Sequence, residues 1–399
     1  MTSDPARLPL TQMTFASPVP ESARWLAGVE FPPDRPLINV AQAAPMAPPP
    51  EGLRRAMAEA LEDPATHRYA PDLGLPPLRA AFAEHWGRLY GGLVTASQVT
   101  VTSGANHAFC AAIAALCASG DAVMLPVPWY FNHKMWLDMA GVETVPLPTG
   151  ADLLPDPEAA RARITPRTRA IVLVTPNNPA GIDYPADLIG AFFDLARETG
   201  LRLILDETYR DFHGGPGTPH DLLSRPDWDE TVVQLYSFSK SFRMAGHRIG
   251  AMVGAPGLMP EVEKFIDTVT ICATPLSQRA ALWGLANLGQ WLEEQRSDLA
   301  ARRAHLKTAF APLAERGWHL RGLGGYFAYV EHPFALNTQD MSRRLVREAG
   351  ILALPGAMFA PPGTPQAARH LRVACANIDA GQIDALVARL AALPWPLAP

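Results

Sequence analysis

The stretch TVVQLYSFSK, residues 231–240, joins an apolar run to a polar tip. Its first six residues, Thr231 to Tyr236, predict a strand buried on both faces, as in a mainly parallel sheet. Ser237, Ser239 and Lys240 follow directly. Ligands of open α/β sheets bind outside the carboxyl ends of the strands. The stretch therefore predicts a strand that delivers a functional lysine to a ligand site.

Four more segments repeat this form. Apolar runs at 98–101, 122–125, 170–174 and 201–205 predict strands, each followed by polar residues. These followers are TSGAN at 102–106, PVPWYFNH at 126–133, TPNNPAG at 175–181 and DETY at 206–209. Helical patterns precede them at 52–61 and 75–89 and lie between them at 104–118 and 187–199. The alternation predicts an α/β fold, with a large domain whose mainly parallel central sheet is flanked by helices.

The rest of the chain predicts a smaller α+β domain built from both chain ends. A long helical stretch at 277–310 leads into strands at 326–330 and 371–374 and helices at 338–349 and 379–390. The proline-dense segment between Pro18 and Pro50 favours extended backbone and predicts an arm laid across another surface, with disorder as the alternative. The expected division is an arm with part of the small domain at 1–45, a large domain at 46–285 and a small domain at 286–399.

The composition argues against several classes of protein. The 399 residues carry a formal net charge of −5 with the charges interspersed, which argues against a nucleic-acid surface. The most apolar stretch, 108–118, is shorter than the roughly 20 residues of a membrane span. MTSDPARLPLTQMTF lacks the form of a signal peptide, so a cytoplasmic location is expected. The four cysteines, at 110, 117, 272 and 375, are expected to be reduced core thiols, and no metal site is predicted.

Two charged residues point to a specific chemistry. Schiff-base formation needs an amine with a depressed pKa, and Lys240 stands at a strand end between serines; a solvated surface lysine is the alternative. Asp206 ends an apolar strand, where a carboxylate needs a cation. The protonated ring nitrogen of pyridoxal 5'-phosphate (PLP) is such a cation, and a structural salt bridge is the alternative.

A phosphate site is predicted beside them. Ser103-Gly104-Ala105 opens a helix, and the free N–H groups there suit a phosphate, although Ser-Gly can also serve only as a helix cap. Ser237, Ser239 and Arg248 could complete a phosphate cup, with the arginine binding through two nitrogens.

Eight motifs occur together along nearly the whole chain. They are HRYAPDLGLPPLR at 67–79, TSGANHAF at 102–109, PNNPAG at 176–181, LDETY at 205–209, YSFSKSFRMAGHRIG at 236–250, GGYF at 324–327, LPGAMF at 354–359 and HLRVACAN at 370–377. As a set they resemble the fold-type I PLP-dependent aminotransferases of class I/II.

The resemblance implies roles for individual residues. Lys240 would hold PLP as a Schiff base and act as the general acid/base, with Asp206 as partner of the ring nitrogen. Asn178 and Tyr209 would hydrogen-bond the cofactor's phenolic oxygen, and Tyr130, or alternatively Trp129, would stack on its ring. The implied phosphate cup consists of Gly104, Ala105, Ser237, Ser239 and Arg248, and Asn106 is a further implied cofactor-binding residue.

Further roles concern the partner subunit and the substrate. Tyr69 resembles the tyrosine that reaches the phosphate of the neighbouring subunit, which implies a homodimer with shared active sites. Arg372 resembles the arginine that binds the substrate α-carboxylate, with Asn178 and Ala43 also facing the substrate. Ala43 stands where many relatives have glycine, Ala180 replaces a threonine, and His247 replaces a residue that is often apolar.

The resulting hypothesis is ping-pong transamination between an amino acid and a 2-oxo acid. Aromatic side chains at 129–131 and 326–327 favour an apolar, aromatic, methionine, glutamine or kynurenine donor. The first alternative is a C–S β-lyase of the same fold, in which a Thr-Tyr-Leu pattern is expected where this chain has GGYF at 324–327. The second, a transcription regulator with a fused DNA-binding head, lacks support because the residues before 50 are short and hardly basic.

Overall fold

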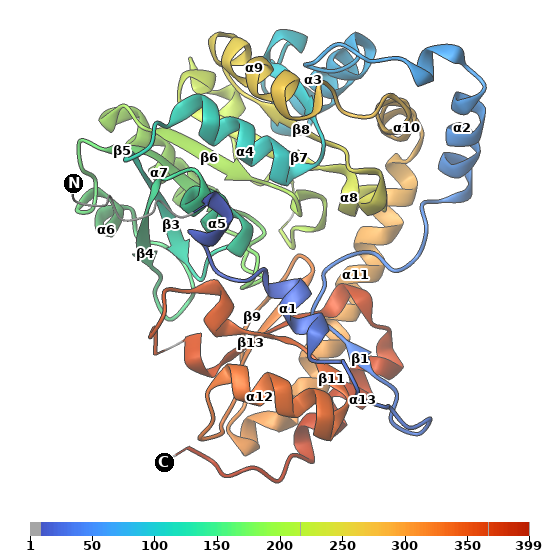
Figure 1. Cartoon of the computed structure of the whole chain (residues 1–399), viewed down its shortest axis with the longest axis vertical. Coiled ribbons are helices and arrows are strands. Elements are labelled where there is room, and N and C mark those ends of the chain that lie inside the picture. The colour runs from blue at the N-terminus through green and yellow to red at the C-terminus, as the bar shows by residue number, and fades with distance from the viewer. Residues whose placement is uncertain (1–8, 216, 366, 399) are drawn as a thin grey trace, which may run out of the picture.

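The computed structural model describes residues 9–215, 217–365 and 367–398. A seven-stranded sheet lies at the centre of the larger part of the molecule, in the order β2-β8-β7-β6-β5-β3-β4 (Figure 1). Its strands are β2 (Val99–Thr102), β3 (Ala122–Val127), β4 (Glu143–Pro148), β5 (Thr168–Val174), β6 (Arg202–Asp206), β7 (Val232–Ser237) and β8 (Gly250–Val253). Strand β8 runs opposite to the other six, so the predicted mainly parallel sheet is confirmed.

Helices cover both faces of this sheet. On β5, Ile171 and Leu173 pack into one core cluster, while Ala170 and Val172 pack into another. Successive strand residues point to opposite faces, which explains why the strands are continuous apolar runs. The first cluster includes α2 (Glu51–Leu61), α3 (Pro76–Tyr90), α7 (Ala186–Thr199) and α10 (Pro275–Asn287); the second includes α4 (Ala105–Leu116), α5 (Phe131–Met139) and α9 (Met259–Thr270).

The five strands predicted to carry polar followers, β2, β3, β5, β6 and β7, all run in the same direction. Their carboxyl ends therefore meet at one edge of the sheet. The short helix α8 (Phe238–Ser241) continues from β7 at that edge and carries Lys240. The convergence predicted from the sequence is confirmed.

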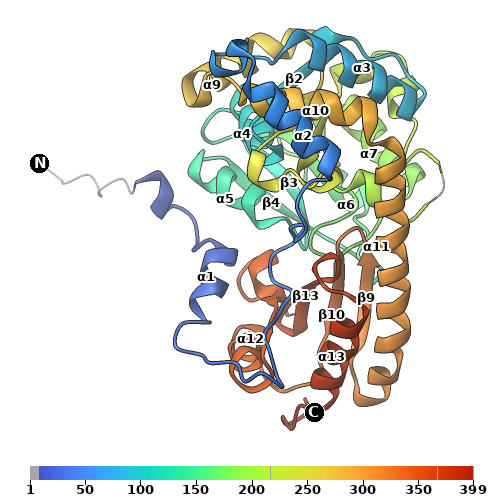
Figure 2. The ribbon, with the colours of Figure 1, turned by 90° about the vertical axis from the view of Figure 1, so that its right-hand side faces the viewer.

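The second part of the molecule is built around a four-stranded antiparallel sheet. Its order is β12-β13-β10-β9, with β9 (His319–Gly324), β10 (Phe327–Glu331), β12 (Leu354–Pro355) and β13 (His370–Ala374). The helices α12 (Thr338–Arg344) and α13 (Ala380–Ala391) contribute to its core, as does the long helix α11 (Gly289–Phe310), which runs along one side of the molecule in Figure 2. Ile38 and Val40 from the N-terminal segment belong to the same core.

The N-terminal segment thus packs with the C-terminal part of the chain. Its strand β1 (Ile38–Asn39) pairs in parallel with β11 (Ile351–Leu352). A small unit built from both chain ends is observed, while the boundaries at 45/46 and 285/286 stay predictions. The first eight residues of the expected arm, which also begin the stretch searched for a signal peptide, lie outside the described residues.

Some local expectations were wrong. The proline-rich segment is not extended throughout, because α1 (Pro18–Arg24) is a helix that begins on a proline, where the missing N–H is not needed. The stretch 277–310 is two helices, α10 and α11, separated at Leu288, and α12 ends in a π-helical turn at Leu345–Ala349. β4 and β8 were not foreseen. All four cysteines are free, but only Cys375 is fully buried.

Among the described residues, no helix is both long and apolar enough to cross a membrane.

Candidate active site

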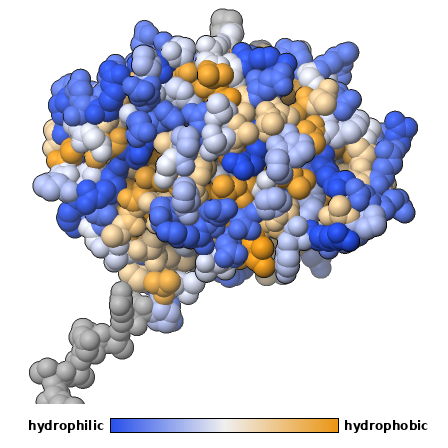
Figure 3. Space-filling view, turned by 90° about the horizontal axis from the view of Figure 1, so that it is seen from above, coloured by the Kyte–Doolittle hydropathy of each residue, from blue (hydrophilic) through white to orange (hydrophobic). Residues whose placement is uncertain are grey.

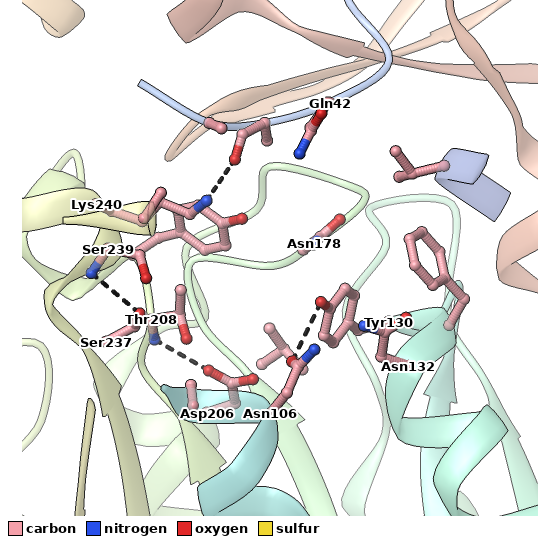
Figure 4. Close-up of a pocket in the computed structure, with 18 of the residues that line it drawn as sticks. Gln42, Asn106, Tyr130, Asn132, Asn178, Asp206, Thr208, Ser237, Ser239 and Lys240 are labelled. Carbon is pink, nitrogen blue, oxygen red and sulfur yellow. Dashed lines mark hydrogen bonds between the residues drawn. The ribbon is translucent and has the colours of Figure 1, made fainter. Parts of the chain in front are cut away.

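A cavity of about 450 Å³ opens at the carboxyl ends of the central strands, between the two parts of the molecule (Figure 4). Its volume falls within the range of small-molecule and cofactor pockets. Twelve residues singled out from the sequence line it: Ala43, Ala105, Asn106, Tyr130, Asn178, Asp206, Tyr209, Ser237, Ser239, Lys240, Arg248 and Arg372.

Lys240 is the amine of the cavity. Its Nζ donates a hydrogen bond to the backbone oxygen of Ala43 and lies 5.7 Å from the ring centre of Tyr209. Burial, with the positive charges of Arg372 and Arg248, lowers the pKa of Lys240 to about 7. A lysine in this setting is uncharged often enough near neutral pH to act as a nucleophile or base.

Asp206 is a buried carboxylate at the end of β6. Its Oδ1 accepts a hydrogen bond of 3.0 Å from the backbone N–H of Thr208, and its Oδ2 lies 3.1 Å from Nε2 of His133. Burial acts to raise the pKa of Asp206, but the contacts with His133 and Thr208 outweigh it, and the pKa is lowered overall. The carboxylate is therefore ionised and can face a cationic ligand atom.

The part played by His133 was missed in the sequence. The residue served there only to align Tyr130, and nothing in its spacing indicated a contact with Asp206. In the structure α5 buries His133 and its ring stacks on Phe109 with centres 3.9 Å apart. The only available signal was its position in the polar stretch that follows β3.

The beginning of α4 has the geometry to hold an anion. Gly104 has a φ of +88°, and a Cβ there would lie 2.7 Å from Nη2 of Arg248. The first N–H groups of the helix and the arginine therefore converge on the place that a side chain at residue 104 would fill. Ser237 and Ser239 line the same region, and Oγ of Ser237 accepts a hydrogen bond from the backbone of Ser239.

Arg372 enters from β13 of the small sheet. It is 2% exposed, and Nη1 donates a 2.9 Å hydrogen bond to Oδ1 of Asn178. Burial lowers the pKa of Arg372 to about 10, and its Nε has no hydrogen-bond partner among the described residues. A buried guanidinium with an unused donor suits a planar carboxylate.

Of the two residues predicted to stack on the cofactor ring, only one lies at the cavity. Tyr130 lines the cavity and donates a 3.3 Å hydrogen bond to Asn106, whereas Trp129 is buried in a core cluster and does not line it. Gly104 does not line the cavity, and its proposed contribution is through its backbone. Tyr69 lies outside the cavity of its own chain, with 79% of its surface exposed.

The structure adds residues that the sequence did not suggest. The wall also includes Ser17, Val19, Pro20, Gln42, Asn132 and Thr208. Ser17, Val19 and Pro20 come from α1 and its N-cap, and Gln42 from the segment after β1. Figure 4 shows Gln42 on the opposite side of the cavity from Asp206.

These groups fit PLP. The anion site suits a phosphate, the ionised Asp206 suits a protonated ring nitrogen, and the Lys240 amine suits an aldehyde. Arg372 remains available for the carboxylate of a substrate. All of these groups face one cavity.

Known proteins resemble the chain along most of its length. The sequence profile of the family described as aminotransferase class I and II matches residues 35–390. An aromatic aminotransferase of Arabidopsis thaliana is 30% identical over 88% of each chain, and a probable aspartate/prephenate aminotransferase of Thermus aquaticus is 29% identical over 86% of this chain and 87% of its own. The structure of a Thermus thermophilus aspartate aminotransferase with maleate matches with a TM-score of 0.86 and 27% identity, over 97% of this chain and 99% of that one.

Proposed function

Because the chain belongs to the class I and II aminotransferases, which are PLP-dependent transferases, we propose that it moves the amino group of an apolar, aromatic or methionine- or glutamine-like amino acid to a 2-oxo acid. Lys240 is the residue proposed to bind the cofactor as a Schiff base. The observation that carries the proposal is the low-pKa amine of Lys240 in one cavity with Asp206 and Arg372.

Each residue has a proposed task. PLP, when bound, supplies a carbonyl carbon for amine attachment and a ring that accepts electron density. Arg372 binds the substrate α-carboxylate and so orients the α-carbon toward Nζ of Lys240. The neutral Nζ removes the α-proton and returns it to the cofactor side, while the carboxylate of Asp206 keeps a ring nitrogen protonated.

The proposed donor class follows from the charges of the cavity wall. Among the described residues, its cations are Lys240, Arg248 and Arg372, and each already has a proposed task. One wall includes part of the N-terminal segment. It is formed by Val19, Pro20 and Phe131 with the polar Ser17 and Asn132. This wall favours an uncharged side chain over a second carboxylate. The Arabidopsis relative is named an aromatic aminotransferase, whereas other relatives are named for aspartate.

A homodimer with shared active sites remains part of the proposal. The exposed Tyr69 could reach a second copy, and exposed apolar side chains occur on or beside α2, α3 and α9 at Leu61, Leu93 and Val269. Figure 3 views this end of the molecule and shows apolar patches among hydrophilic side chains. The cytoplasmic location stays a prediction.

Subunit mixing tests the shared site. Tyr69→Ala should weaken PLP binding, and Lys240→Ala should abolish turnover. In a mixed dimer the Tyr69→Ala chain keeps its lysine and receives Tyr69 from the other chain, so refolding the two variants together should restore activity to one site per dimer. Absence of complementation in mixed dimers of verified composition would contradict the shared site.

The activity itself is tested by replacing the proposed anchor. Lys240→Ala should lose the absorbance of covalently bound PLP and nearly all turnover, whereas Lys264→Ala, at an exposed lysine, should keep both. A panel of amino donors against pyruvate and 2-oxoglutarate identifies the substrate. Conversion of the cofactor to its amine form by a donor alone supports transamination; pyruvate and ammonia formed without an acceptor would favour the β-lyase alternative.

A further inference from the structure

A second cavity, of about 420 Å³, lies between the large sheet and the small sheet. Val127 and Pro128 at the end of β3 and the loop 148–153 after β4 form its wall on one side. Strands β9, β10 and β13 form the other side, through residues that include Tyr329 and His370. In Figure 1 the loop after β4 reaches toward these strands. The cavity is nearly as large as the proposed active site, and none of the catalytic residues lines it.

One end of this cavity carries an excess of positive charge. Arg321 donates to Oε2 of Glu331 through Nε at 2.8 Å and through Nη2 at 2.5 Å. Nε of Arg369 lies 3.8 Å from the other oxygen, Oε1, and its Nη2 donates to the backbone oxygen of His332 at 3.0 Å. Two guanidinium groups thus share one carboxylate. Their side chains are each 42% exposed, so the N–H groups that Glu331 and His332 leave unused can bind a second anion.

The remainder of the cavity is mostly apolar. Val127, Pro128, Leu153 and Ala360 line it, beside the ring of Tyr329, which stacks on His370 with centres 4.8 Å apart. A ligand that filled this space would need a flat or compact apolar body next to its anionic group.

Leu153 lies on the wall of this cavity in an unusual backbone conformation. Its φ is +64°, a conformation that a bulky residue rarely adopts. The loop holds it there through hydrogen bonds of 3.0 Å from Leu153 to Gly150 and from Gly150 to Leu154.

We propose that this cavity is a second binding site of the enzyme, for a small carboxylate that carries an apolar body. The carboxylate lies against Arg321 and Arg369, and the apolar body lies between Pro128, Leu153 and Tyr329. The site is separate from the transamination site and does not depend on the donor proposed above.

The two cavities are lined by different residues of the same two segments, which couples the second site to the first. His370 lines the second cavity and Arg372 the first, and these alternate residues of β13 point to the same face of the small sheet. Likewise Val127 and Pro128 line the second cavity, and Tyr130 lies two residues further on in the first. The backbone N–H of Trp129 between them donates to Phe359 at 2.8 Å. A ligand in the second cavity therefore braces the two segments that position Arg372 and Tyr130.

Calorimetric titration of the holoenzyme with 3-phenylpropionate tests the binding site, because this probe has a carboxylate and an apolar body but no amino or oxo group. We expect two equivalents per chain. One is lost in Ala151→Trp, in which an exposed loop residue is enlarged to fill the second cavity. The affinity of the same equivalent falls about tenfold or more in Arg321→Ala and in Arg369→Ala. Arg347→Ala, at an exposed arginine outside the cavity, serves as the matched control.

The other equivalent should be lost in Arg372→Gln. A single equivalent that disappears in Arg372→Gln and is unaffected by Ala151→Trp would overturn the proposal, as would no binding at all. Since Ala151 is on an exposed loop, loss of folding does not explain a selective effect of its replacement.

Kinetics test the coupling. At the active site the probe competes with the donor equally in the wild type and in the Arg321→Ala/Arg369→Ala double variant. Any difference between the two in how the probe changes KM therefore comes from the second site. With the probe present, we expect the wild-type KM for the donor to be about fivefold lower than the KM that competition at the active site alone would give. Identical KM changes in both proteins would overturn the coupling.

Discussion

Nε2 of His133 lies 3.1 Å from Oδ2 of Asp206, and the two side chains are only 2% and 4% exposed. His133 belongs to α5 and Asp206 to the end of β6, so the contact joins two segments that follow different strands. It offsets the burial of the carboxylate and helps to keep it ionised.

Replacing His133 by phenylalanine should retain the stack on Phe109 and remove the nitrogen that faces Asp206. The pKa of Asp206 then rises, because burial is less well opposed. We expect kcat to fall about tenfold, which corresponds to about 1.4 kcal/mol of lost transition-state stabilisation. The measurement is kcat together with the pH dependence of the cofactor absorbance. His319→Phe, at an exposed histidine of β9, should leave both unchanged.

A methyl group at residue 104 should disturb the anion site. The Cβ of Gly104→Ala would lie 2.7 Å from Nη2 of Arg248, and the φ of +88° adds backbone strain. We expect the affinity for PLP to fall about tenfold or more and the unfolding free energy to fall by about 1–3 kcal/mol. PLP dissociation and thermal unfolding of the same samples measure the two effects.

The variant Gly120→Ala separates the effect of backbone strain from the effect of steric crowding against Arg248. Gly120 has a similar φ of +91°, but a Cβ there meets no atom within 4 Å. This control should lose comparable stability and keep its affinity for PLP. Equal affinities in both variants would contradict the placement of the phosphate beside Arg248.

The capture of PLP by the apoenzyme should depend on the protonation of Lys240. Its pKa is lowered to about 7, so the amine is protonated below pH 7 and neutral above it. Because only the neutral amine attacks a carbonyl, the capture rate should rise as the pH increases through about 7 and level off above it. Stopped-flow absorbance measures the rate. An increase that continued toward about 10.4, as for free lysine, would show that the buried setting does not lower the pKa.

Arg372→Lys should retain the positive charge and lose the planar pair of donors. A buried charge-assisted hydrogen bond contributes about 1.5–3 kcal/mol, so we expect KM for the amino donor to increase about 10- to 100-fold with a smaller change in kcat. Steady-state kinetics at several donor concentrations measure KM and kcat separately. Arg347→Lys should have wild-type constants, and a wild-type KM in Arg372→Lys would exclude a role in carboxylate binding.

Much of the candidate active site could be predicted from the sequence, because the parallel strands bring its residues to one edge of the sheet. Once β2, β5, β6 and β7 are recognised, Ala105, Asn178, Asp206 and Lys240 must meet, since parallel strands end at the same edge. Arg372 was identified only through its motif. Its approach to Asn178 spans 194 positions of sequence and depends on how the small sheet packs against the large one.

The sequence by itself determined the α/β class and the groups delivered by the strand ends, because these depend on local apolar patterns and on residues that directly follow each strand. The family was identified from the resemblance of a set of motifs along the chain. Only the tertiary structure decided the pairing of His133 with Asp206, the contribution of α1 to the cavity wall, the position of Tyr130 rather than Trp129 on that wall, and the cavity at Arg321 and Arg369. These features depend on contacts between segments that no sequence period relates, and such contacts are set by how whole elements pack.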